Sequence, residues 1–145
     1  MVIFGSDHAG FEAKSHVIDY VKHKGFSVLD LGTYSNKSVD YPEYGVAVAK
    51  AIQKQEYASG IIICGTGIGI SISANKVKGA RAALCTTPFH AEMARKHNDA
   101  NILVMGARTT SFSEMEVIID VWFSTDFEGG RHQHRVDKIH SLTEK

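Results

Sequence analysis

A cysteine followed by a glycine-rich loop is the combination of residues in this sequence best suited to chemistry. Residues 64–69 read Cys-Gly-Thr-Gly-Ile-Gly and follow an apolar run at 60–63. Glycines let a ligand approach backbone N–H groups, and N–H groups at a helix start favour an anion or a thiolate. Cys64 is therefore a candidate base. The alternatives are a tight strand–helix turn and a buried structural cysteine, and Cys85 fits the second description.

The spacing of the loop argues against nucleotide binding. It reads GxGxG, whereas dinucleotide-binding folds use GxGxxG and place an acidic residue after the next strand; here the next strand ends in Cys85 and Thr86. A P-loop needs Gly-Lys-Ser/Thr, but Gly69 is followed by Ile70 and Ser71. The sequence gives no reason to expect a nucleotide cofactor.

Basic residues in the last third of the chain are candidates for acid–base and anion-binding roles. His97 falls at the end of a predicted helix, where the dipole favours a protonated ring, although an exposed capping histidine is the alternative. Arg131 and Arg135 are four residues apart and suit a phosphate, although they could form a solvated basic face. His132 and His134 form only a short His-x-His pair, which is too little to indicate a zinc site, so we predict no metal site.

Polar residues also follow the first predicted strand. Asp7 could orient a ligand hydroxyl or cap the first helix, and His8 stands beside it. Tyr41, just before Pro42, is by its type alone more often a packing aromatic than a ligand contact.

The elements that must position these residues alternate along the chain. Gly25 is expected to end the first helix, Thr87 to cap the fourth, and Ser113 with Glu116 to form a capping box on the fifth. The alternation predicts an α/β fold, a single Rossmann-like three-layer domain over residues 1–145 with a five-stranded parallel sheet and helices on both faces. Ligands of such sheets bind beyond the carboxyl ends of the strands. The predicted strands cover residues 2–5, 27–31, 60–64, 80–85 and 102–105, and the predicted helices cover 11–24, 42–54, 67–76, 88–96, 113–123 and 131–142.

The composition excludes several classes of partner. Sixteen basic residues balance sixteen acidic ones, so no global field favours nucleic acid or an anionic membrane. We expect no secretory signal, since no basic segment followed by an apolar one begins the chain, and no run approaches the ~18 apolar residues of a membrane span. Cys64 and Cys85 form no CxxC pair, and we expect reduced thiols in a cytoplasmic protein.

Six motifs in order resemble the type B ribose-5-phosphate isomerases, a family that includes allose-6-phosphate and galactose-6-phosphate isomerases. The resemblance runs nearly end to end. It implies an aldose–ketose isomerisation by ring opening and proton transfer through a cis-enediolate, in the non-oxidative branch of the pentose phosphate pathway and without a cofactor. The motifs are GSDHAGF at 5–11, DYP at 40–42, CGTGIG at 64–69 with ANK at 74–76, HNDAN at 97–101, GAR at 106–108 and GRHQHRV at 130–136.

The resemblance also implies a role for each site residue. Cys64 would take the C2 proton, and Ile70 stands where relatives with serine in place of the cysteine carry a glutamate base. Thr66 would assist at the reacting centre, and His97 would open the ring. Sites are expected between two subunits, in a dimer or a tetramer. The implied substrate-binding residues are Asp7, His8, Tyr41, Gly65, Gly67, Ile68, Gly69 and Asn98, with Arg108, Arg131 and Arg135 at the phosphate.

Three other functions stay open. A six-carbon substrate such as allose-6-phosphate depends on pocket length, which a sequence does not measure. Acyl transfer by Cys64 and His97 would need a cysteine at an elbow flanked by glycines, whereas Ile63 precedes it. A non-catalytic sugar-phosphate-binding protein is the third alternative, which the full set of base, acid and arginines disfavours.

Overall fold

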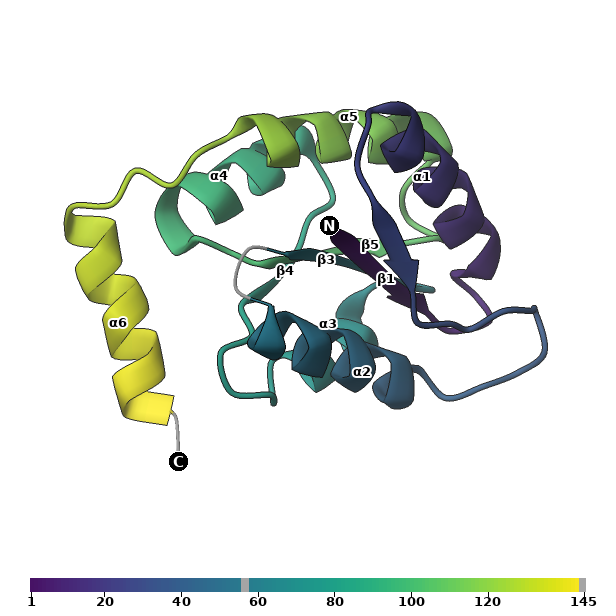
Figure 1. Cartoon of the computed structure of the whole chain (residues 1–145), viewed down its shortest axis with the longest axis horizontal. Helices are drawn as coiled ribbons and strands as arrows, with labels where there is room; N and C mark the ends of the chain where they lie inside the picture. The colour runs from purple at the N-terminus through teal and green to yellow at the C-terminus, as the bar shows by residue number, and fades with distance from the viewer. Residues whose placement is uncertain (56–57, 144–145) are drawn as a thin grey trace.

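A computed structural model describes residues 1–55 and 58–143 of the chain, and a five-stranded parallel sheet forms its centre (Figure 1). The strand order is β2-β1-β3-β5-β4, and all four neighbouring pairs are parallel. The chain thus begins near one edge of the sheet, moves to its middle and continues toward the other edge. The strands are β1 (Val2–Ser6), β2 (Val28–Asp30), β3 (Ser59–Cys64), β4 (Ala82–Leu84) and β5 (Ile102–Gly106).

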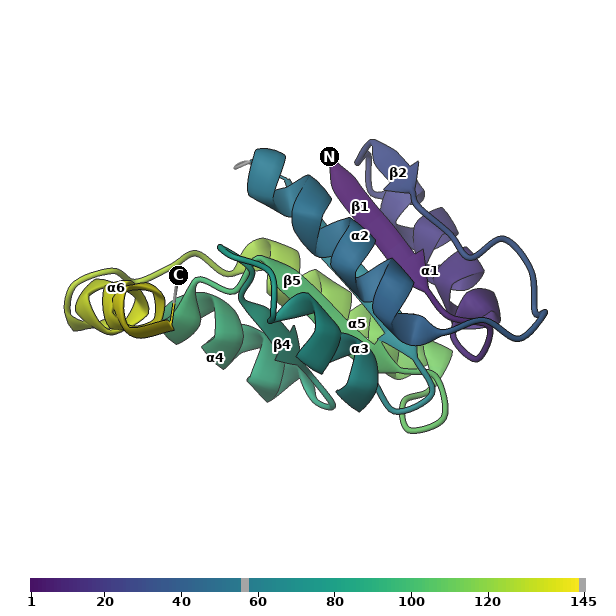
Figure 2. The same cartoon turned by 90° about the horizontal axis from the view of Figure 1, so that it is seen from below.

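Helices cover both faces of this sheet. α1, α4 and α5 lie on one face and α2 and α3 on the other, while α6 stands beside the sheet next to α4 (Figures 1 and 2). The α/β class, the five strands and the two helical layers predicted from the sequence are confirmed. The helices are α1 (Phe11–His23), α2 (Tyr41–Lys54), α3 (Ile68–Ala74), α4 (Pro88–Asn98), α5 (Phe112–Ser124) and α6 (Arg131–Thr143).

The central strand β3 shows why its sequence is continuously apolar. Successive side chains of a strand point to opposite faces. Ile61 and Ile63 therefore join the core under α1, α4 and α5, whereas Ile62 and Cys64 join the core under α2 and α3. All four residues are buried. The alternation fixes the side of the sheet on which the sulfur of Cys64 lies.

Helix ends follow local sequence signals, with one correction. Thr87 accepts a hydrogen bond from the N–H of His90, as its predicted capping role requires, and Gly25 adopts φ +96° just after α1. The predicted capping box of Ser113 and Glu116 is wrong. Ser111 caps α5 by accepting from the N–H of Glu114 at 3.2 Å.

A serine followed three residues later by a glutamate occurs twice at the start of α5, at Ser111 and at Ser113. A tertiary contact favours the earlier serine as the cap. Phe112, the first residue of α5, stacks on His16 of α1 with ring centroids 4.5 Å apart. That stack holds the first turn against its neighbouring helix.

Across the residues that the structure describes, no helix combines the length and the apolar character that crossing a membrane demands.

Candidate active site

Three strand ends meet at the carboxyl edge of the sheet and bring together most of the predicted site residues. Cys64 ends β3, which lies between β1 and β5. The loop after β5 is tied to the loop after β3, because the N–H of Ala107 donates to the carbonyl of Cys64 and the N–H of Arg108 to that of Gly65, both at 2.8 Å. These bonds hold the glycine loop against Arg108.

The sulfur of Cys64 lies beneath the glycine loop. The N–H of Gly67 donates to Sγ at 3.2 Å, and Cys64 is 5% exposed. Gly67 adopts φ +80° as the residue that precedes α3, a conformation that favours glycine. A backbone N–H aimed at sulfur is an arrangement that suits a thiolate. Cys85 is different, because burial raises the pKa of its thiol to about 12.

Glycines in the loop leave room for two predicted ligand-binding side chains. A Cβ on Gly65 would lie 3.2 Å from Nη1 of Arg108. A Cβ on Gly69 would lie 2.5 Å from the ring of Tyr41, so this ring lies directly over the loop. The hydroxyl of Thr66 turns back on the loop and accepts from the N–H of Ile68 at 3.3 Å.

Asp7 and His8 stand at the neighbouring strand end. Asp7 is 7% exposed, and its Oδ1 accepts from the N–H of Gly10 at 3.0 Å. That bond shapes the turn before α1 but is no helix cap, because Gly10 is itself the residue that precedes the helix. Nδ1 of His8 lies 3.1 Å from the backbone nitrogen of Val39 and 3.2 Å from its carbonyl oxygen, and these contacts fix the ring.

The remaining predicted residues lie at the opposite edge of the sheet. His97 and Asn98 form the end of α4, which precedes β5, and β5 begins beside the first residues of β3 rather than beside Cys64. Arg131 and Arg135 are exposed in the first turns of α6. Figure 2 shows α6 beside α4 at one side of the molecule. Within a single chain, therefore, Cys64 lies apart from four predicted site residues: His97, Asn98, Arg131 and Arg135.

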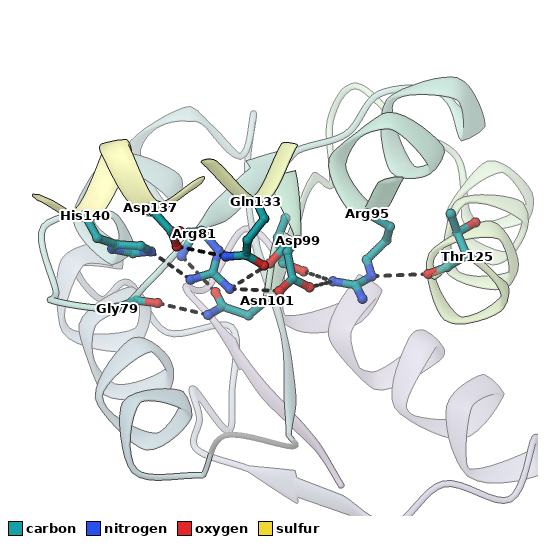
Figure 3. A network of polar contacts seen from close by, with 10 residues as sticks. Gly79, Arg81, Arg95, Asp99, Asn101, Thr125, Gln133, Asp137 and His140 are labelled. Atoms are coloured by element: carbon teal, nitrogen blue, oxygen red, sulfur yellow. Dashed lines mark hydrogen bonds and ion pairs between the residues drawn. The ribbon is translucent and has the colours of Figure 1, made fainter. Parts of the chain in front are cut away.

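A polar network connects α6 to the end of α4 (Figure 3). Nε and Nη2 of Arg81 donate to the carbonyl of Asp99 at 3.0 and 2.8 Å, and Nη1 lies 2.9 Å from Nε2 of His140 in α6. Arg95 donates to Oδ1 of Asp99 at 3.0 Å. The network fixes α6, which carries the two arginines, relative to the end of α4.

The sequence did not indicate a role for two residues beside His97. The ring of His132 stacks on that of His97, with centroids 4.2 Å apart and planes 13° apart, and Oε1 of Glu128 lies 3.7 Å from Nε2 of His97. Burial first, and then the positive charge of His97 and Arg131, lowers the pKa of His132. A spacing of 35 residues gives no periodic signal that could have linked the two histidines.

The trio of His97, Glu128 and His132 could be taken for a metal site, since its ligand atoms lie within 4.8 Å of one another. The geometry argues otherwise. Lone pairs of imidazole nitrogens lie in the ring plane, so two nearly parallel rings direct them side by side, whereas a bound zinc ion needs ligands that converge on one point. The arrangement is better suited to moving protons than to holding an ion.

A hollow of about 910 Å³ in the described part of the chain is not lined by the glycine loop. It lies between α3, β4 and α6, with Ile72, Asn98 and Ile139 among its lining residues. Ile72 and Ile139 are exposed, at 57% and 45%. Cys64 and the glycine loop, which carry the predicted base and the predicted anion-binding amides, lie outside this hollow.

The chain is similar to known sugar-phosphate isomerases over nearly its whole length. A model of the ribose/galactose isomerase family matches residues 2–139. Ribose-5-phosphate isomerase B of Escherichia coli is 42% identical over 144 residues, which cover 99% of this chain and 97% of that protein. The structure of a Clostridium thermocellum ribose-5-phosphate isomerase B has a TM-score of 0.96 and 49% identity, covering 97% of this chain and 95% of that one.

A Mycoplasma genitalium ribose-5-phosphate isomerase B with bound ribulose-5-phosphate has a TM-score of 0.95 at 40% identity, covering 99% of this chain and 96% of that one. The family model and these relatives extend over nearly the whole chain, including both edges of the sheet that carry the predicted residues. The resemblance inferred from six sequence motifs is thereby confirmed. The chain belongs to the ribose/galactose isomerase family.

Proposed function

We propose that this chain is an aldose–ketose isomerase that interconverts ribose-5-phosphate and ribulose-5-phosphate. The observation that carries the proposal is the sulfur of Cys64 under the amides of the glycine loop, 3.2 Å from the N–H of Gly67. It is supported by relatives named for this activity, one of them a structure with ribulose-5-phosphate bound at 40% identity.

The isomerisation itself is assigned to the Cys64 edge. The thiolate takes the C2 proton of the open-chain aldose and leaves an enediolate. The proton of the C2 hydroxyl then passes to O1, and the same sulfur returns the carbon-bound proton to C1 to give the ketose. Backbone N–H groups between Gly65 and Gly69 stabilise the enediolate oxygen, for which one donor is typically worth ~2.7–4 kcal/mol. The hydroxyl of Thr66 assists at the reacting centre. No hydride moves, so the proton transfer requires no nicotinamide.

Ring opening and phosphate binding are assigned to the other residues of the predicted set. His97, with Asn98 beside it, gives a proton to the ring oxygen. Side chains at the Cys64 edge, Asp7 and His8 with Tyr41 over Gly69, contact the sugar. Three arginines bind the phosphate through the paired N–H donors of their guanidinium groups. They are Arg108, Arg131 and Arg135.

We also propose that each site is completed by a second subunit, in a homodimer or a tetramer. This is supported by the separation of Cys64 from His97 across the sheet of a single chain. Three large apolar side chains that follow Cys64 and β4 are exposed, and a second copy would cover them: Ile68 at 54%, Ile72 at 57% and Phe89 at 64%. The cytoplasm, a reducing compartment, suits the free thiols of Cys64 and Cys85.

A turnover assay on the purified protein in the presence of a chelator tests the proposed function. We expect ribose-5-phosphate to be converted to ribulose-5-phosphate. Cys64→Ala should lower kcat by at least about 10²-fold, the lower range for loss of a general base, while it still binds the sugar phosphate. Cys85→Ala is the matched control and should keep the wild-type rate. A wild-type protein that binds ribose-5-phosphate without converting it would instead be a binding protein.

A six-carbon sugar phosphate is the second candidate substrate, because the matching family model is described as a ribose/galactose isomerase. The discriminating measurement is kcat/KM for ribose-5-phosphate against that for allose-6-phosphate under the same conditions. We expect the five-carbon substrate to be preferred. A higher kcat/KM for the six-carbon substrate would reassign the enzyme within its family.

A further inference from the structure

The stacked pair of His97 and His132 is built by tertiary contacts at the start of α6. The N–H of Glu128 donates to the carbonyl of Lys96 at 3.1 Å, and the N–H of His132 donates to that of Gly129 at 3.1 Å. The first bond holds the segment before α6 against the last turn of α4, and the second closes the turn at the start of α6. His132 then lies 8% exposed with its ring 4.2 Å from that of His97, whose side chain is 40% exposed.

His132 keeps its ring nitrogens available. Neither nitrogen has a hydrogen-bond partner among the described residues. Ser6 Oγ is the one fully buried side-chain polar atom among those residues that lacks a partner, so the nitrogens of His132 are accessible to solvent. Burial and the neighbouring charges of His97 and Arg131 lower the pKa of His132, which favours a neutral ring near pH 7. A neutral imidazole with an unused lone pair is a proton acceptor.

Opening a furanose requires two proton transfers at one carbon. The ring oxygen gains a proton as its bond to C1 breaks, and the hydroxyl on C1 loses a proton as the C1 carbonyl forms. Both oxygens are bonded to C1, so the donor and the acceptor must lie side by side. Two imidazoles stacked in parallel place their nitrogens side by side in this way, and a pair of groups whose environments differ suits an acid and a base.

We propose that His132 is the base of ring opening, paired with His97 as the acid. The inference rests on the proposed function and extends it. His97 gives its proton to the ring oxygen, His132 takes the proton of the C1 hydroxyl, and the C1–oxygen bond of the ring breaks to leave the open aldehyde. Exchange with solvent then returns a proton to His97 and removes one from His132. The carboxylate of Glu128 orients Nε2 of His97 from 3.7 Å.

Ribulose-5-phosphate gives a measurement that bypasses this step. Its fifth oxygen carries the phosphate, so the ketose forms no furanose and enters the site as an open chain. In D2O, the Cys64 machinery alone should therefore exchange deuterium into its C1 position. Turnover of ribose-5-phosphate needs ring opening as well. The ratio of the two rates reports on ring opening separately from proton transfer.

The decisive variant is His132→Phe, which keeps an aromatic ring for stacking and removes the nitrogens. We expect kcat for ribose-5-phosphate to fall about 10²- to 10⁴-fold, the range for a lost acid or base, with spontaneous opening in solution as the floor. Deuterium exchange into ribulose-5-phosphate should stay within about twofold of wild type. His97→Asn should give the same pattern, and His134→Phe, at an exposed position of the same helix, is the control.

The possible outcomes separate this inference from the proposed function. Near-normal turnover of ribose-5-phosphate by His132→Phe would overturn the inference and leave stacking as the only role of His132. Equal losses of turnover and exchange would overturn it too, because the defect would not be specific to ring opening. A wild-type protein that shows neither turnover nor exchange would overturn the proposed function and this inference with it.

Discussion

At the residue scale, two cysteines in one small chain have opposite environments. Both are buried and both end apolar segments, so their sequence contexts are similar. Cys64 receives a hydrogen bond from a backbone N–H, whereas the Cys85 thiol donates to the carbonyl of Ala83 at 3.6 Å. A donor aimed at sulfur stabilises a thiolate, and an acceptor stabilises a thiol. The difference has a direct chemical consequence.

Alkylation of the native protein should therefore be selective. At pH 8 a thiol with a pKa of about 12 is ionised in roughly one molecule in 10⁴, so iodoacetamide should spare Cys85 and label Cys64. Mass spectrometry of the peptides measures the label on each cysteine over time. Ribose-5-phosphate should slow the reaction, and Cys64→Ala should stay unlabelled until it is unfolded. Faster labelling of Cys85 would contradict the assigned environments.

The sequence allowed the Cys64 edge to be predicted but not the pairing of His97 with His132. Cys64, Thr66 and their glycines are consecutive, so one strand–loop–helix unit determines how they meet. The sequence relates His132 only to its near neighbours such as His134, because spacing along a helix is all that a sequence offers. Its stacking partner is in another helix, and no local pattern encodes that contact.

At the element scale, the predicted bounds of the helices and strands lie within two residues of those in the structure. The residue that caps α5 is where the prediction failed. The pattern of serine followed three residues later by glutamate occurs at Ser111 and again at Ser113, and local rules do not rank them. The stack of Phe112 on His16, between residues almost 100 positions apart, favours the earlier start.

The two serines provide a matched test of this assignment. Ser111→Ala removes the oxygen that accepts from the N–H of Glu114, and it should lower the free energy of unfolding by about 1 kcal/mol. Ser113→Ala lies inside the helix and should change it by less than about 0.5 kcal/mol. Urea titration followed by circular dichroism measures both. A larger loss for Ser113→Ala would place the cap where the sequence alone predicted it.

At the scale of the whole molecule, the site residues fall into two groups that one chain holds apart. The Cys64 loop and its neighbours occupy the carboxyl edge of the sheet, and His97 with the α6 arginines occupies the other side. The sequence named both groups but gave no distance between them. A symmetric pair of subunits would bring the first group of one chain to the second group of its partner, twice per dimer.

Mixing two inactive variants tests this account most directly. Subunits with Cys64→Ala are combined with subunits with His97→Asn, under conditions in which subunits exchange, and turnover of ribose-5-phosphate is measured. Half of the dimers should be mixed and each should hold one intact site, so we expect about one quarter of the wild-type rate. If each chain built its own site, every site would carry a defect. A mixture no more active than either parent would contradict the account.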